Sequence, residues 1–244
     1  MIKRLLRRFI ARPDFPATAP DSPFFAVGDI HGRADLLHRF LDTKPTHPVI
    51  CVGDYVDRGD HSADVLRMLH ARPDIICLSG NHEEMMLDFL TAPERSGPRW
   101  LRYGGLQTLA SFGVAGVTDS SGAEALSNAR DQLQTAMGAD LLEWMRAMPT
   151  LWQSGNVAVV HAAASPARNM EEQRTATLHW GHPHFTKAQR TDGIWVIHGH
   201  TIVDAAHIEN GRIAIDTGAY ATGRLTVALI EPGITTFQTI TSFK

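Results

Sequence analysis

Short apolar runs alternate with segments of helical periodicity in the first third of the chain. Three apolar runs predict strands, and the periodic segments that follow them predict helices. In chain order, these expected elements span residues 24–27, 34–41, 49–52, 62–70, 75–78 and 83–90. Strands that alternate with helices are typical of a largely parallel sheet with crossover helices. The pattern therefore predicts an α/β fold.

The rest of the chain divides into a helical part and a strand-rich part. Residues 93–150 contain few strand-like runs and predict a mostly helical insertion, with loops at Pro98 and from Trp100 to Gly105. Strand signals dominate after this insertion. The expected strands span residues 157–160, 194–197, 213–215, 225–230 and 234–240.

The N-terminal segment differs in composition from the rest of the chain. Residues 1–12 contain five basic residues and no acid, and their apolar residues fall on one face of a helix. Pro13, Pro16 and Pro20 then mark a linker. We expect residues 1–22 to form a basic segment and linker, and residues 23–244 to form a single domain. The basic helix would contact a membrane surface or a partner, or pack on its own domain.

Composition excludes several classes of protein. The 244 residues are 43% apolar and 20% charged, with a formal net charge of −3, so no nucleic acid is expected as a partner. No apolar run is long enough to span a membrane. The two cysteines, Cys51 and Cys77, lie in apolar runs and predict buried strand residues without a redox role. Low cysteine content and the lack of a signal peptide favour the cytoplasm.

Candidate chemistry gathers where the expected strands end. Five strands run into segments that carry Asp, Asn or His, and ligands of open α/β sheets bind beyond the carboxyl ends of strands. These segments are Gly28-Asp29-Ile30-His31-Gly32, Gly53-Asp54-Tyr55-Val56-Asp57-Arg58-Gly59, Gly80-Asn81-His82-Glu83, His161 and His198-Gly199-His200. The residue types suit Mn, Fe or Zn. The candidate ligands are Asp29, His31, Asp54, Asn81, His161 and His200.

The size of this set predicts two metal ions that share a carboxylate. Two close divalent ions can acidify a shared water and clamp an oxyanion, which is the chemistry of phosphoryl hydrolysis. Arg58 can bind phosphate oxygens, and His82 can give a proton to a leaving alkoxide. His198 lies on the same strand face as His200, and we expect it to have a structural role.

The ordered series of motifs resembles the metallophosphoesterase (calcineurin-like) superfamily, and within it the bacterial and phage-lambda-like PPP phosphatases and the symmetrical diadenosine tetraphosphatases. The resemblance covers most of residues 24–230, including Ile215-Asp216-Thr217-Gly218-Ala219. It implies a β-sandwich of two mixed sheets flanked by helices.

The resemblance also implies roles for single residues. The first metal would take Asp29, His31 and the bridging Asp54, and the second would take Asp54, Asn81, His161 and His200. His82 would be the general acid, oriented by Asp57, and Arg58 would hold the substrate phosphate. A hydroxide that bridges the metals, most simply Mn ions, would attack phosphorus in line.

Three departures from the family pattern concern substrate binding. Ser79 stands where a basic residue is usual, and His161 is followed by three alanines. The segment Trp180-Gly181-His182 has His182 where the family has a second phosphate-binding Arg. His182 would then bind the phosphate more weakly than Arg. Alternatively, Arg168, Arg174 or Arg190 reaches the phosphate.

These features leave three functions open. The first is a serine/threonine protein phosphatase acting on a phosphorylated protein or a small phosphoester. The second is a diadenosine tetraphosphate hydrolase with the same metal core. The third, from another class, is a catalytically weak protein that binds the metals.

Overall fold

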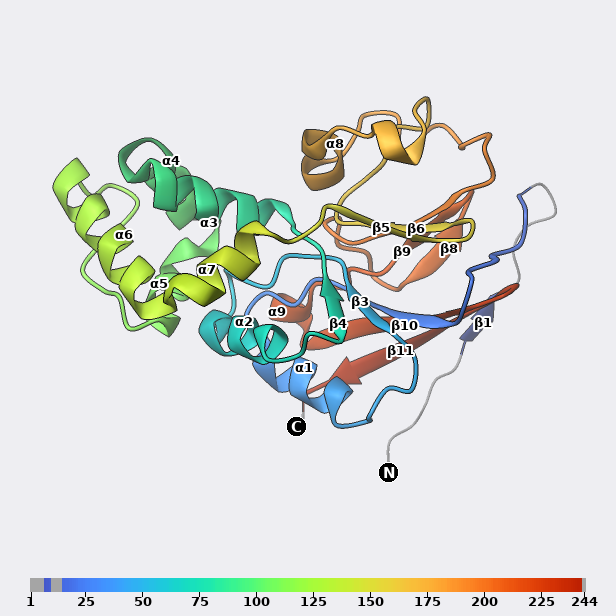
Figure 1. The fold of residues 1–244 in the computed structure, drawn as a ribbon, viewed down its shortest axis with the longest axis horizontal. Helices are drawn as coiled ribbons and strands as arrows, with labels where there is room; N and C mark the ends of the chain where they lie inside the picture. The colour runs from blue at the N-terminus through green and yellow to red at the C-terminus, as the bar shows by residue number, and fades with distance from the viewer. Residues whose placement is uncertain (1–6, 10–14, 243–244) are drawn as a thin grey trace.

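Two mixed β-sheets are stacked on each other, and helices cover their outer sides (Figure 1). The computed structural model describes residues 7–9 and 15–242. This arrangement confirms the expected α/β sandwich of two mixed sheets flanked by helices.

The first sheet has the strand order β1-β11-β10-β2-β3-β4. Strands β2, β3 and β4 are parallel, whereas β10 pairs antiparallel with both β2 and β11. The bounds are β1 (Arg7–Phe9), β2 (Phe24–Val27), β3 (Val49–Cys51), β4 (Ile75–Cys77), β10 (Arg224–Glu231) and β11 (Ile234–Thr241). Cys51 and Cys77 are buried opposite each other on β3 and β4, in the strand positions predicted for them.

The second sheet has the order β5-β6-β7-β9-β8, with β6, β7 and β9 parallel. Its bounds are β5 (Leu151–Ser154), β6 (Val157–Val160), β7 (Trp195–His198), β8 (His207–Glu209) and β9 (Arg212–Ala214). The edge strands β5 and β8 were not predicted. Both are short and pair antiparallel with their neighbours, and their residues are half-buried or exposed except for Ser154, so they lack an apolar run.

Most of the helices lie between β4 and β5 in the sequence. In chain order, the helices are α1 (Ala34–Leu41), α2 (Ser62–His70), α3 (Asn81–Thr91), α4 (Pro93–Trp100), η1 (Leu101–Gly105), α5 (Leu106–Ser111), α6 (Ala123–Met137), α7 (Ala139–Arg146), η2 (Met170–Glu172), α8 (Thr175–Trp180) and α9 (Ala219–Thr222). Helices α3 to α7 form a lobe beside the sandwich, and α8 lies against the second sheet (Figure 1). No helix of the described residues has the length and apolar character needed to cross a bilayer.

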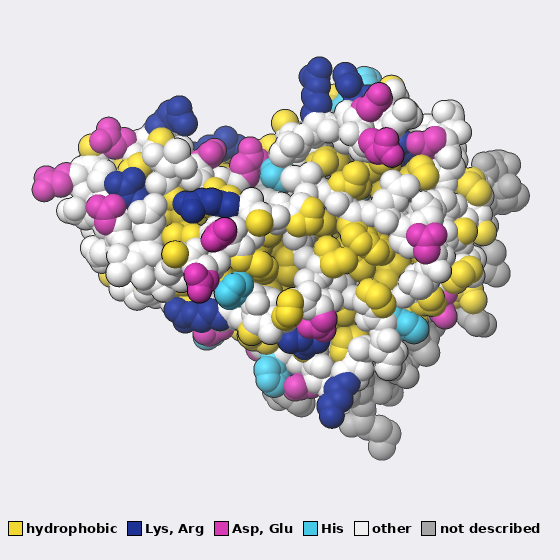
Figure 2. Space-filling view, in the orientation of Figure 1, with side chains coloured by type: hydrophobic (Ala, Val, Ile, Leu, Met, Phe, Trp, Pro, Cys, Tyr) yellow, Lys and Arg dark blue, Asp and Glu magenta, His cyan; other side chains and the backbone are white. Residues whose placement is uncertain are grey.

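The core has two main layers. Between the sheets, residues such as Phe24, Ile50, Val159 and Ile197 are fully buried. A second layer packs the first sheet against α1, α2 and the helical lobe. Figure 2 shows one face of the molecule, in the orientation of Figure 1. Apolar side chains gather in the middle of that face, near β4 and β5, while charged groups are scattered over the helical lobe.

The segment around Pro98 is helical, contrary to the predicted loops. Pro98 lies inside α4, and Leu101–Gly105 forms a π-helical turn in which Gly104 has φ of 114°. Buried Trp100 anchors this region, and Gly97 lets α4 approach Phe89 and Leu126 closely. Tertiary packing therefore overrides the helix-breaking tendency of proline here.

The predicted N-terminal helix is wrong at the three residues of this segment that the structure describes. Arg7–Phe9 form β1, which pairs antiparallel with β11. The edge of β11 offers unpaired backbone groups, and an added strand satisfies them. The rest of that prediction falls on residues 1–6 and 10–14, outside the described residues.

Candidate metal centre

The loops after β2, β3, β4, β6 and β7 bring polar side chains to one edge of the sandwich. The parallel strands of the first sheet end there with Asp29, Asp54 and Asn81, and those of the second sheet end with His161 and His200. The sheet topology thus gathers residues that lie more than a hundred positions apart in the sequence.

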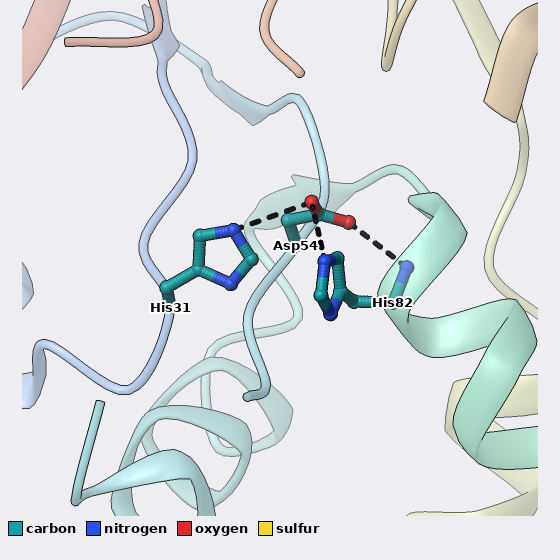
Figure 3. Close-up of side chains that lie close together, drawn as sticks. All are labelled: His31, Asp54 and His82. Atoms are coloured by element: carbon teal, nitrogen blue, oxygen red, sulfur yellow. Dashed lines mark hydrogen bonds and ion pairs between the residues drawn. The ribbon is translucent and has the colours of Figure 1, made fainter. Parts of the chain in front are cut away.

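Asp54 lies between two groups of imidazoles. Its Oδ2 is 3.4 Å from His31 Nε2 and 3.9 Å from His82 Nε2 (Figure 3). Its Oδ1 is 3.4 Å from His161 Nε2 and accepts a hydrogen bond from the His82 backbone N–H at 3.1 Å. Each carboxylate oxygen therefore faces a different set of polar groups, an arrangement that suits a ligand shared by two ions.

Asn81 completes the group on the Oδ1 side. Its Oδ1 lies 2.8 Å from both His161 Nε2 and His200 Nδ1, and the two imidazole rings are 5.1 Å apart. Ligand atoms of Asp54, His161 and His200 lie within 4.8 Å of one another, as do those of His31, Asp54 and His82. Both groups could hold a metal ion.

Asp29 lies outside these two compact groups but close to them. Both of its carboxylate oxygens accept from the His200 backbone N–H, at 3.2 and 3.0 Å. Burial and the nearby Asp216 and Asp54 carboxylates raise its pKa well above the ordinary value. A bound cation would relieve this repulsion between buried carboxylates.

His31 and His161 are in the protonation state that a metal ion needs. Burial lowers the pKa of His31 and of His161 to about 3, so both are neutral near pH 7. Burial alone would raise the pKa of Asp54, but His161, His82 and His31 outweigh it and the pKa falls. Neutral imidazoles and an ionised carboxylate are the forms that bind metal. The donor set thus fits divalent ions.

His82 is held by a network around Asp57. Its Nδ1 is 2.6 Å from Asp57 Oδ2, and Asp57 also accepts from Trp100 Nε1 and from Thr108 Oγ1 at 2.7 Å. The backbone N–H of Asp57 donates to Thr108 Oγ1 at 2.8 Å. This network fixes the ring so that its Nε2 faces Asp54.

Arg58 lies beside the first group. Its Nη1 is 3.2 Å from His31 Nε2, and its guanidinium stacks on the ring of Tyr220 at 4.9 Å. The backbone N–H of Arg58 donates to Gly104 O at 3.3 Å, which links it to the π-helical turn. A Cβ on Gly104 would lie only 2.6 Å from Arg58 N.

Glu83 supports the loop that carries Asp54, and sequence reasoning gave it no role. Its carboxylate accepts from the backbone N–H groups of Asp54 and Tyr55 at 2.8 Å and of Gly80 at 2.9 Å. Burial raises its pKa to about 7, and the charge of Asp54 adds to this shift. Its place in the Gly-Asn-His-Glu motif is the sequence feature from which this supporting role could have been predicted.

Five of the site residues have backbone conformations that are rare outside glycine. His31, Asp54, Asp57, Arg58 and His200 have φ between 43° and 70°. Such backbone strain concentrates at functional sites, where the surrounding structure holds it in place.

The residues proposed for a second phosphate contact lie outside both compact groups. His182 is half-buried, and its Nδ1 accepts from the His184 backbone N–H at 3.2 Å. Arg190 is buried and donates to Ser165 O at 2.9 Å, so its guanidinium is already engaged. For Arg168 and Arg174, the described contacts are made by backbone atoms.

His198 also lies outside the two groups. Its ring contacts Phe185 edge-on at 4.9 Å, and its Nδ1 is 3.1 Å from Gly199 O. Burial lowers its pKa to about 4.

Comparison with known proteins agrees with this geometry. A family model described as calcineurin-like phosphoesterase matches residues 22–204. The chain is 30% identical over 223 residues to serine/threonine-protein phosphatase 2 of Escherichia coli (strain K12). This match covers 85% of this chain and 92% of that protein.

A second relative has another substrate in its name. The chain is 30% identical over 149 residues to the symmetrical bis(5'-nucleosyl)-tetraphosphatase of Pseudomonas fluorescens (strain SBW25). That match covers 58% of this chain and only 43% of the relative. Among solved structures, a cold-active protein-tyrosine phosphatase of Shewanella shares the fold, with a TM-score of 0.58 and 17% sequence identity. The structural match covers 95% of this chain and 83% of that chain.

Proposed function

The chain belongs to the calcineurin-like phosphoesterases, and on that premise we propose that this hydrolase removes phosphate from phosphoserine and phosphothreonine in proteins. The position of Asp54 carries the proposal, because its two carboxylate oxygens face separate groups of histidines. Such a carboxylate suits a pair of divalent ions.

We propose the same metal ligands that the sequence motifs indicate. One ion would be held by Asp29, His31 and Asp54, and the other by Asp54, Asn81, His161 and His200. We propose manganese, because the donors are imidazoles, carboxylates and an amide oxygen, with no thiolate. When bound, two such ions supply Lewis acidity toward the phosphate and activate water.

The chain's own residues supply the remaining chemistry. His82 would give a proton from Nε2 to the leaving alkoxide, because its Nδ1 is held by Asp57 at 2.6 Å. The burial of His82 tends to lower its pKa, but Asp54 and Asp57 outweigh this, so the pKa is raised and the acid form is favoured. Arg58 would hold the substrate phosphate with a guanidinium oriented by Tyr220.

The choice of a protein substrate rests on how much of each relative the chain matches. The match to the Escherichia coli phosphatase spans 92% of that protein and 85% of this chain. The tetraphosphatase match spans 43% of the relative, so much of that protein has no matched counterpart here. The tetraphosphatase remains the second candidate, because its matched part is equally identical.

A side-by-side kinetic comparison tests the proposal. The Mn²⁺-loaded protein is assayed with a phosphoserine peptide, p-nitrophenyl phosphate and diadenosine tetraphosphate. We expect the highest kcat/KM on the peptide. A preference for diadenosine tetraphosphate would replace the proposed substrate, and turnover of none of the three would support a weakly catalytic metal-binding protein.

A further inference from the structure

Glu84 joins the first turn of α3 to the last turn of α8. Its Oε2 lies 2.8 Å from His179 Nδ1 and accepts from Trp180 Nε1 at 2.8 Å. The guanidinium of Arg99, on α4, stacks on the Trp180 ring at 4.6 Å. This cluster therefore ties the helical lobe to the helix that covers the second sheet.

His179 has an unfilled hydrogen-bonding position. The hydrogen bond from His179 lowers the pKa of Glu84, with further contributions from Trp180 and Arg99, so the carboxylate is ionised and Nδ1 is the donor. The Nε2 of His179 is buried and has no partner among the described residues.

The end of α8 is also attached to the metal centre. Leu178 O accepts from the Ala162 backbone N–H at 2.7 Å, and Ala162 directly follows His161. Immediately beyond α8, Gly181 turns the chain with φ of 96° and leads into His182.

We propose that Glu84 is a positioning residue for substrate binding: by holding His179 and Trp180, it fixes the end of α8 and the following turn beside the metal centre. The inference rests on the proposed phosphoesterase function. The imidazole of His182 offers at most two N–H groups, and a hydrogen bond tolerates only a few tenths of an ångström in distance. The turn that carries it must therefore be held firmly.

A set of variants on α3 and α8 tests this role. Glu84→Ala removes the clamp, whereas Glu84→Gln keeps an oxygen that can accept from the Trp180 indole. Asp88→Ala is the matched control, because it removes an exposed carboxylate one turn further along the same helix. The measurements are KM and kcat on a phosphoserine peptide, the Kd of inorganic phosphate by calorimetry on Mn²⁺-loaded protein, and the melting temperature.

We expect Glu84→Ala to raise KM and the phosphate Kd about tenfold, with kcat changed by less than about threefold. Glu84→Gln should recover most of the affinity, and Asp88→Ala should match the wild type. Unchanged KM and phosphate Kd in folded Glu84→Ala would overturn the proposal, as would a loss confined to kcat.

A second variant covers the case in which Glu84→Ala does not fold. His179→Phe keeps a ring in the same space and removes both nitrogens, and it carries the same expectation. Wild-type affinity in His179→Phe would then overturn the proposal. The calorimetric Kd of phosphate separates the positioning role of Glu84 from the proposed protein phosphatase function. It reports on Glu84 even if the phosphoserine peptide proves not to be a substrate.

Discussion

Asp54 is the residue on which the proposed metal centre depends most. It is almost completely buried, and one of its carboxylate oxygens faces His31 while the other faces His161. Its neighbours hold it ionised, and Glu83 fixes its backbone. The loss of its charge should therefore affect both groups at once.

We expect Asp54→Asn to bind less than one metal ion per chain and to lose activity on every phosphoester. The amide keeps the shape of the side chain but cannot bridge two cations as a carboxylate does. Elemental analysis after dialysis against Mn²⁺ and a turnover assay measure the two effects. Wild-type turnover with two bound ions would rule out the bridging role.

His82→Asn should keep both metal ions and lose activity on alkyl phosphates by about 10²- to 10⁴-fold, the usual contribution of general acid catalysis. The loss should be much smaller for p-nitrophenyl phosphate, because its leaving group barely needs a proton. The measurement is kcat on both substrates with metal content as the control. Equal losses on alkyl and aryl esters would argue against the acid role.

Residues with a motif could be predicted from the sequence, and residues that support them could not. Asp54, Asn81 and His161 stand at strand ends in a specific order, so sequence and topology bring them together. Trp100 and Thr108, which hold Asp57, come from the helical lobe and have no distinctive spacing. Their role follows from tertiary packing alone.

At the scale of elements, the π-helical turn Leu101–Gly105 supports Arg58. Gly104 accepts the Arg58 backbone N–H and has a φ that L-residues rarely adopt. This contact couples the helical lobe to the residue proposed to hold the phosphate.

Gly104→Ala should destabilise the protein by about 2–4 kcal/mol and raise KM, because a Cβ adds backbone strain and a clash with Arg58. Gly113→Ala is the matched control: Gly113 has φ of 78°, but its added Cβ would meet nothing within 4 Å. It should cost about 1–2 kcal/mol and leave KM unchanged. Urea unfolding and steady-state kinetics measure both, and equal effects of the two variants would contradict the coupling.

Element boundaries followed the apolar pattern where helices and strands are amphipathic or fully buried. Helices α1 and α2 begin and end as predicted from their periodicity. The pattern failed at Pro98, where packing of α4 against α3 and α6 decides the conformation, and at β1, where pairing with β11 does. Both depend on neighbours that are distant in the sequence.

At the scale of the whole molecule, buried histidines make stability depend on pH. His198 has a folded-state pKa of about 4 and an ordinary value of 6.5. Below pH 6.5 the unfolded chain binds a proton that the folded protein excludes, so its contribution to stability is complete above pH 6.5 and falls as pH decreases toward 4.

Between pH 7.5 and 5.5, the wild type should lose about 1.4 kcal/mol more unfolding free energy than His198→Gln. The glutamine variant lacks this titrating group and retains the others, so the difference isolates one imidazole. Urea denaturation at both pH values gives the two free energies. Parallel pH profiles would show that His198 titrates normally in the folded protein.

The order of strands in the first sheet has a consequence for synthesis. Strands β10 and β11 follow all the other strands in the sequence, yet they lie between β1 and β2. As the chain leaves the ribosome, β2, β3 and β4 emerge early, and β2 then waits about two hundred residues for its neighbour β10. During that time its edge is open to other chains. Nascent chains stalled before β10 should therefore bind chaperones, and release of the last strands should end that dependence.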